Sequence, residues 1–185
     1  FGKNGRVWDR DRIVIIPDHY IFTADSLSSR NVDILRVFVM EHGITYFYDV
    51  IDDPHGKWVF DPARGMLNRQ YGRQYAGVCH TALPQKGHTR PGEVLLGTDS
   101  HTCMAGAFNE FSAGIGNTDA GFVMGTGKLL LKVPETMHFR LEGELGPGVS
   151  AKDVILQCIG EIGFDGATYR AMQFDGCGVA HLSMD

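Results

Sequence analysis

Several features that would place this 185-residue sequence outside the ordinary globular proteins are missing from it. No apolar run approaches the roughly 18 residues that a membrane-spanning helix needs, and no signal-peptide pattern opens the chain. The net charge is −5 and the two signs are interspersed, so there is no basic stripe of the kind that nucleic-acid binding requires. We therefore expect neither a membrane nor a nucleic acid as a partner.

Cysteine is also scarce and scattered. The four cysteines, Cys79, Cys103, Cys158 and Cys177, form no CxxC pair. In a chain of this size such spacing is typical of reduced, intracellular thiols, and not of a disulfide framework. Such cysteines are more often small buried hydrophobic residues than ligands. Internal repeats, low-complexity tracts and heptads are absent as well.

What is present is an alternation of strand and helix signals. A continuous β-branched run over 12–22 predicts a strand buried on both faces, ended by Pro17. Apolar residues at helical spacing predict a capped helix over 28–43, and the aromatic run 44–50 predicts a second strand. Strand, helix and strand at this spacing indicate a βαβ unit with a parallel pair.

The rest of the chain continues this alternation. Residues 51–76 lack periodicity and predict a long surface excursion, and a short buried element carrying His80 follows. The further expected elements are a strand at 93–99, tightly packed helices over 105–127 with an N-cap at Thr118–Asp119, strand-like segments on both sides of Pro134, a helix over 149–163 with a Ser150–Asp153 capping box, and a strand at 167–176. Together they predict one α/β domain over 1–185, built as three α/β/α layers with a mostly parallel sheet.

Polar side chains gather where these strands are expected to end, which is where open α/β sheets form their sites. A carboxylate beside an imidazole fixes its tautomer and raises its basicity. Such groups can supply general acids and bases, or can ligate a metal ion. The candidates are Asp18, His19, His80, Asp99, Ser100 and His101.

Structural uses of the same residues are equally compatible with the spacing. An isolated Asp-His dipeptide is more often structural than catalytic, and Ser100 after Asp99 can simply cap the next helix. The Gly-rich stretch that follows can serve close helix packing, since it matches neither the P-loop nor the dinucleotide-binding fingerprint. Five further histidines receive no role: His42, His55, His88, His138 and His181.

The motifs PDHYIFTAD, GVCHTAL, GTDSHT and KVPETM occur in this order, and the predicted helices lie between and after them. In this combination the chain resembles the aconitase superfamily, and within it the large subunits of isopropylmalate isomerases. The resemblance extends from about residue 12 onward and is weakest over 51–76. It implies the first subdomain of an aconitase-type iron–sulfur domain.

The resemblance also implies an activity. Enzymes of this type are [4Fe-4S]-dependent hydro-lyases that isomerise 2-isopropylmalate and 3-isopropylmalate by dehydration and rehydration, in leucine biosynthesis. An open iron acts there as a Lewis acid. The implied partners are a small subunit that forms a swivelling domain and a hydroxy diacid, whose identity among isopropylmalate, homoaconitate and citramalate types stays open. The implied location is the cytoplasm, or the plastid stroma in a plant or alga.

Roles for four residues follow from the matched motifs. Asp18 and His19 resemble a pair whose imidazole protonates the departing hydroxyl. His80 and Asp99 resemble a second pair, which we expect two strand ends to bring together.

The remaining matches and departures concern the ligands. His101 resembles a histidine near the iron-bound water, and Ser100 resembles a substrate-carboxylate contact. Met104 stands where aconitases proper carry Asn, which favours a substrate with an apolar branch over citrate. The superfamily's ligand cysteines, two of them in a CxxC, are expected to lie outside this chain, as are a glutamate partner for His101 and a serine base. Since the chain also starts at Phe1 without Met, we expect a fragment that is inactive alone.

Two alternatives stay open. One is a mononuclear metal hydrolase that uses His19, His80, Asp99 and His101. The other is a non-catalytic, stand-alone module, which the fold alone does not separate from an enzyme.

Overall fold

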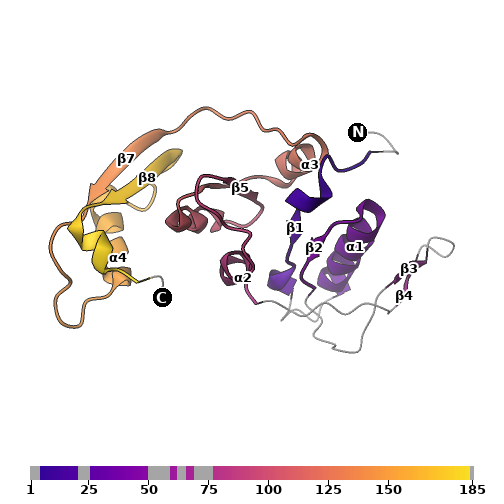
Figure 1. The fold of residues 1–185 in the computed structure, drawn as a ribbon, viewed down its shortest axis with the longest axis horizontal. Helices are drawn as coiled ribbons and strands as arrows, with labels where there is room; N and C mark the ends of the chain where they lie inside the picture. Colours follow the sequence, from indigo (N-terminus) through magenta and orange to yellow (C-terminus); the bar gives the residue numbers. More distant parts are fainter. Residues whose placement is uncertain (1–4, 21–25, 50–58, 62–65, 69–76, 184–185) are drawn as a thin grey trace. The chain divides into compact units, whose positions relative to one another are not determined.

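The structure is a computed structural model, and it describes residues 5–20, 26–49, 59–61, 66–68 and 77–183. The chain divides into two compact units, Phe1–Leu129 and Leu130–Asp185 (Figure 1). The expectation of a single domain over 1–185 stays a prediction. Within the described ranges, none of the helices combines the length and apolarity that crossing a membrane would need.

The first unit opens with a βαβ arrangement. β1 (Val14–Ile15) and β2 (Tyr46–Phe47) pair in parallel, and α1 (Ser26–His42) connects them. The predicted βαβ unit is therefore confirmed. The α1 helix ends at Gly43, whose φ of +65° is the left-handed conformation that suits a glycine after a helix. The serine predicted at the helix start is Ser28, and the structure does not describe its side chain.

β1 is much shorter than the strand predicted over 12–22. A 3-10 turn, η1 (Arg10–Arg12), precedes it and a second one, η2 (Asp18–Tyr20), follows it. Pro17 does end the extended segment, as expected, because its ring removes the backbone N–H that a ladder would need. Residues 21–22 lie outside the described residues. Asp18 and His19 therefore lie in a turn shortly after a strand.

The core of this unit is small and apolar. Ile13, Val39, Ile44 and Phe47 form one buried cluster between the strand pair and α1. Burying such side chains contributes about 1.5–3 kcal/mol each relative to exposure. This cluster fixes α1 against β1 and β2, and thereby the position at which β1 ends.

The segment 51–76 contains a feature that the sequence did not indicate. β3 (Val59–Asp61) and β4 (Met66–Asn68) pair antiparallel, with Phe60 opposite Leu67. The other residues of the segment lie outside the described part of the chain, so the predicted surface excursion stays a prediction, to which the structure adds this short strand pair.

The second half of the first unit carries α2 (Cys79–Gln85), β5 (Val94–Gly97), η3 (Thr102–Phe108), β6 (Phe111–Gly114) and α3 (Asn117–Thr126). β5 and β6 pair in parallel, and the short 3-10 helix η3 lies between them in the sequence. The prediction of helices throughout 105–127 was therefore wrong for 111–114. Small residues there pack into a strand because β5 offers a partner, and tertiary pairing overrides local propensity. The N-cap of α3 is Gly116, not the predicted Thr118–Asp119.

The second unit is another strand–helix–strand arrangement. β7 (Glu135–Arg140) and β8 (Arg170–Asp175) pair in parallel, and α4 (Ala151–Ile162) connects them and lies beside the pair in Figure 1. A final 3-10 helix, η4, spans Cys177–His181. The predicted helix and the final strand are confirmed. The strand predicted on the N-terminal side of Pro134 is not present, because 128–134 pairs with no strand in the described part of the chain.

The predicted capping box of α4 is confirmed. The Ser150 N–H donates to Asp153 Oδ2 at 2.8 Å, and the Ser150 hydroxyl lies 2.7 Å from the same oxygen. The helix ends at Gly163, as predicted.

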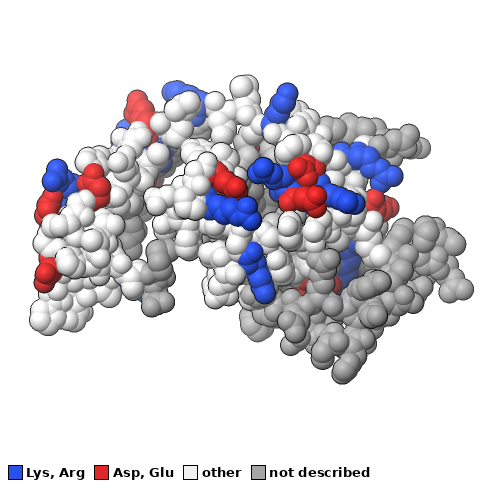
Figure 2. Space-filling model, viewed as in Figure 1, with Lys and Arg blue, Asp and Glu red and all other residues white. Residues whose placement is uncertain are grey.

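The α/β class is confirmed, since helices connect the strands and three of the four strand pairs are parallel among the described residues. Figure 2 shows that basic and acidic side chains of the described residues intersperse on the face drawn there.

Candidate active site

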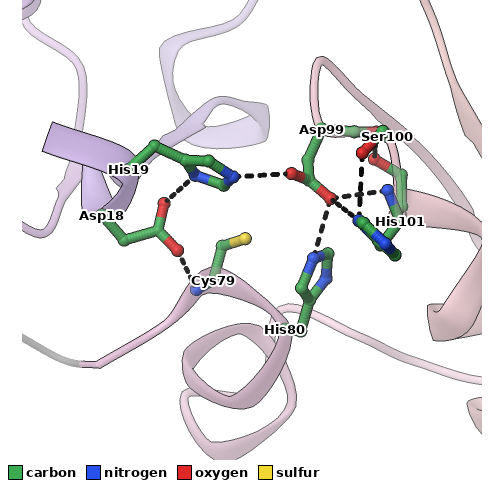
Figure 3. Close-up of polar contacts among 8 residues, drawn as sticks. Asp18, His19, Cys79, His80, Asp99, Ser100 and His101 are labelled. Carbon is green, nitrogen blue, oxygen red and sulfur yellow. Dashed lines mark hydrogen bonds and ion pairs between the residues drawn. The ribbon is translucent and has the colours of Figure 1, made fainter.

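The six predicted site residues all lie in the first unit, and the turns after two strands position most of them (Figure 3). Asp18 and His19 begin η2, just after β1. Asp99 and Ser100 follow β5, and His101 precedes η3. His80 differs from the prediction, because it lies in the first turn of α2 and not at a strand end.

Asp18 and His19 form the first predicted pair. His19 Nδ1 lies 3.0 Å from Asp18 Oδ1. The other oxygen, Oδ2, accepts a 2.7 Å hydrogen bond from the backbone N–H of Cys79. Burial, the largest single influence, would raise the pKa of Asp18, but the hydrogen bonds from Cys79 and His19 outweigh it and hold that pKa below its ordinary value. The carboxylate is therefore ionised at neutral pH.

Asp99 forms the second predicted pair with His80, at 2.8 Å between Oδ1 and Nε2. The same oxygen accepts a 2.7 Å hydrogen bond from the backbone N–H of His101. This backbone bond first, and the neighbouring imidazoles next, lower the pKa of Asp99. The structure thus brings together the two residues that the resemblance paired.

A contact that was not predicted joins the two pairs. His19 Nε2 lies 3.0 Å from Asp99 Oδ2, so both ring nitrogens of His19 face carboxylates. The hydrogen bond and charge of Asp18, and then the charge of Asp99, raise the pKa of His19. Since its side chain is 64% exposed, His19 is the most open member of this contact, whereas Asp99 is 16% exposed. A solute can therefore reach this imidazole, whose pKa the two carboxylates raise.

Ser100 and His101 lie at the exposed edge of the site. The Ser100 hydroxyl is 3.0 Å from His101 Nδ1, and this nitrogen is 3.7 Å from Asp99 Oδ1. Ser100 does not cap the following helix, because His101 occupies the N-cap of η3 and makes no side-chain capping bond. The structural alternative for Ser100 is therefore wrong, and both side chains are available to a bound molecule.

Cys79 was overlooked as a site residue. Figure 3 shows its side chain beside the Asp18–His19 pair, next in sequence to His80. Burial, and then the charge of Asp18, raises the pKa of its thiol to about 12. The thiol is therefore protonated at neutral pH. The one signal in the sequence was its position next to a candidate histidine.

The donors can be compared with what a metal ion or a cluster would need. His80, Asp99 and His101 offer ligand atoms within 4.8 Å of one another, a set that suits one ion such as zinc. His19 is not a member, so the ligand set of the hydrolase alternative shrinks to three. A cubane cluster needs gathered thiolates. Across the described residues no cysteine joins a group of three such ligands, so the cysteines of this chain do not fit a [4Fe-4S] cluster.

The candidate site is thus a cluster in an α/β unit in which two imidazoles share one carboxylate. Comparison with known proteins shows which family has this combination of fold and residues. The model of the aconitase family (aconitate hydratase) matches residues 59–185, and the chain belongs to that family.

Several curated relatives carry the same name. The Arabidopsis thaliana protein named "3-isopropylmalate dehydratase large subunit, chloroplastic" is 57% identical over 185 residues, which is 100% of this chain and 34% of the relative. The probable 3-isopropylmalate dehydratase large subunit of Methanothermobacter thermautotrophicus is 47% identical over 180 residues, 97% of this chain and 37% of the relative. The 3-isopropylmalate dehydratase large subunit of Syntrophus aciditrophicus is 41% identical over 186 residues, which is 100% of this chain and 39% of the relative. The chain spans about a third of the length of these relatives.

Proposed function

We propose that this chain is part of the large subunit of a hydro-lyase that interconverts 2-isopropylmalate and 3-isopropylmalate by dehydration and rehydration. Membership of the aconitase family and the names of the relatives support this proposal. The observation that carries it is the gathering of His19 and His80 on the Asp99 carboxylate. This arrangement suits the loss and return of a hydroxyl, since hydroxide is a poor leaving group unless it receives a proton.

His19 is the general acid in this proposal. Its Nε2–H points away from Asp18, which fixes the ring through Nδ1. The raised pKa favours the protonated form of the imidazole, and its exposure allows a substrate hydroxyl to reach it. The proton moves from Nε2 to the departing hydroxyl, which leaves as water when its C–O bond breaks, and the imidazole becomes neutral. Asp18 acts by orientation and by stabilising the protonated ring.

Ser100 and His101 contact the substrate. A hydroxy diacid presents carboxylates, and the exposed Ser100 hydroxyl and the His101 ring can both donate to one. Met104 is 43% exposed in η3, in the same turn region. Its apolar side chain would favour a substrate with an apolar branch.

The cofactor and the partner of the complete enzyme belong to the same proposal. Family membership implies an iron–sulfur cluster, whose ligands would be residues outside this chain, and no step is assigned to it. The relatives are named large subunits, which implies a small subunit in those enzymes. We assign to it a swivelling domain that covers the site. The location would be the cytoplasm or, as the Arabidopsis name indicates for that relative, the chloroplast.

The test is turnover by the complete large subunit assembled with its small subunit. Conversion of 2-isopropylmalate to 3-isopropylmalate is followed by NMR, with His19→Gln as the variant. We expect kcat to fall by about 10²–10⁴-fold, the usual contribution of general acid–base catalysis. The matched control is His138→Gln, which breaks another histidine–carboxylate pair, with Asp175 at 2.7 Å in the second unit. Equal rates for His19→Gln and the wild type would refute the assignment.

A second candidate, a mononuclear metal hydrolase, is favoured by the three ligand atoms that lie within 4.8 Å of one another. It requires that this chain bind zinc or manganese by itself, and that His80→Ala abolish the binding. If the assembled protein neither turns over isopropylmalate nor binds such a metal, a non-catalytic module of this fold becomes the better explanation.

A further inference from the structure

The two histidine–carboxylate pairs close into a ring, which neither the sequence nor the family comparison indicated. Asp18 Oδ1 contacts His19 Nδ1, and His19 Nε2 contacts Asp99 Oδ2, each at 3.0 Å. Asp99 Oδ1 contacts His80 Nε2 at 2.8 Å. His80 follows Cys79 directly, and the Cys79 N–H returns to Asp18 Oδ2 at 2.7 Å. Figure 3 shows these contacts.

We propose that Asp99 is a positioning residue that couples the two pairs, so that the His80 hydrogen bond sets how tightly His19 is held at its Nε2. The coupling is a property of the ring itself. Only its effect on turnover rests on the proposed function.

The geometry supports the coupling because Asp99 is a shared acceptor. Its Oδ1 is fixed from two directions, by His80 and by the His101 backbone N–H at 2.7 Å. Its Oδ2 faces His19. A carboxylate that receives several donors divides its charge among them, so losing one donor strengthens its bond to the others.

Burial makes the coupling effective. The side chains of His80, Asp99 and Asp18 are 23%, 16% and 5% exposed, so water screens their contacts only partly. Among the described residues, the Cys79 thiol, which stays neutral, and the His101 imidazole, 3.7 Å from Asp99 Oδ1, are further titratable groups beside these carboxylates.

The coupling has a consequence for the substrate hydroxyl. To receive the His19 proton, the hydroxyl must take the place of Asp99 Oδ2 at Nε2. Asp99 can release His19 without losing its own place, because His80 and the His101 N–H hold the other oxygen. Without His80, Asp99 would bind His19 more tightly and the hydroxyl would compete less well.

The first test uses NMR to measure the contacts of His19 in this ring of residues directly, and it does not depend on activity. The complete large subunit is labelled with ¹⁵N-histidine, and the imidazole nitrogen signals of His19 are assigned by their loss in His19→Gln. We expect His80→Ala and Asp99→Asn to move the His19 Nε2 signal. His80→Gln, whose amide can donate from nearly the same place, should restore much of the wild-type position, and His138→Gln should leave it unchanged. An unmoved His19 signal in His80→Ala would overturn the proposal.

The second test measures coupling in turnover of the assembled enzyme. The kcat effects of His80→Ala and His19→Gln should deviate from multiplicativity by about threefold or more, as for directly interacting residues. The deviation should vanish in an Asp99→Asn background. Multiplicative effects in the wild-type background would overturn the coupling. If Asp99→Asn fails to fold, as circular dichroism would show, the comparison of His80→Ala with His80→Gln decides alone. A wild-type enzyme that leaves isopropylmalate unchanged would refute the proposed function, while the NMR result would still decide the ring.

Discussion

Gly97 lies directly against the side chain of Thr102, so that a Cβ on this glycine would come within 2.6 Å of the Thr102 hydroxyl. That hydroxyl donates a 2.7 Å hydrogen bond to the Asp99 carbonyl oxygen. On the neighbouring strand, a Cβ on Gly114 would approach the same carbonyl to 3.1 Å. The two glycines at the ends of β5 and β6 thus allow the turn that carries Asp99 to fold back closely. The small residues around the motif serve this turn.

The first prediction concerns Gly97→Ala. The added methyl group displaces Thr102 and weakens the hydrogen bond to Asp99, so we expect a loss of about 1–3 kcal/mol in the free energy of unfolding, as for other overpacked sites. Urea denaturation measures it. Gly121→Ala is the control, because a Cβ there meets nothing within 4 Å in α3. It should be neutral or stabilise by up to about 1 kcal/mol. Equal stability of Gly97→Ala and Gly121→Ala would contradict the packing argument.

The second prediction concerns Arg36 and Asp49. Both are buried, and the guanidinium makes hydrogen bonds of 2.8 and 2.9 Å to the two carboxylate oxygens. Asp49→Asn leaves a buried guanidinium with a weaker partner, so we expect a loss of up to about 3–5 kcal/mol. The double variant Arg36→Met with Asp49→Leu should lose less, since no charge is left buried. Chemical denaturation of the three proteins decides, and a double variant as unstable as the single one would count against this account.

Local patterns predicted the parts of the fold that local interactions build. The capping box at Ser150 and Asp153 and the βαβ unit around α1 follow from spacing and from short-range hydrogen bonds. β6 was missed because its strand identity depends on pairing with β5, and the β3–β4 pair was missed because its residues show no periodicity that indicates a strand. The length of β1 was overestimated, since an apolar run does not by itself show where a chain turns.

The site was predictable as a set of residues but not as a geometry. The motifs indicated Asp18, His19, His80 and Asp99, and the two expected pairs are present in the structure. The contact between His19 and Asp99 was not predictable, because it depends on how the ends of β1 and β5 approach each other. The roles of these residues in catalysis stay predictions until the variants are measured.

The third prediction is a pH dependence of stability due to His88. Its Nε2 lies 2.7 Å from the Tyr48 hydroxyl, and its ring lies edge-on to Tyr46 at 4.6 Å between centroids. Burial, and then the charge of Arg90, lowers the pKa of His88 below its ordinary value. The unfolded chain therefore takes up this proton first as the pH falls. The contribution of His88 is complete above about pH 6.5 and is lost as the pH falls toward the lowered pKa.

The comparison with His88→Phe isolates this effect. Phe keeps a ring between the two tyrosines but cannot titrate. Free energies of unfolding are measured for both proteins at pH 7.5, 6.5 and 5.5. The wild type should lose stability relative to the variant as the pH falls, whereas a constant difference across the series would rule out His88 as the cause.

The fourth prediction concerns the thiol of Cys79. With a pKa of about 12, only about one thiol in 10⁴ is ionised at pH 8, and the thiolate is the species that reacts with alkylating agents. Iodoacetamide should therefore modify Cys79 far more slowly than the exposed Cys103 and Cys177. Peptide mass spectrometry over time gives the three rates. Asp18→Asn removes the carboxylate charge closest to the thiol, so it should increase the rate at Cys79 while leaving that at Cys177 unchanged. Because burial is the larger cause of the raised pKa, the increase should be partial, and a rate at Cys79 equal to that at Cys103 in the wild type would show that the thiol is not shielded.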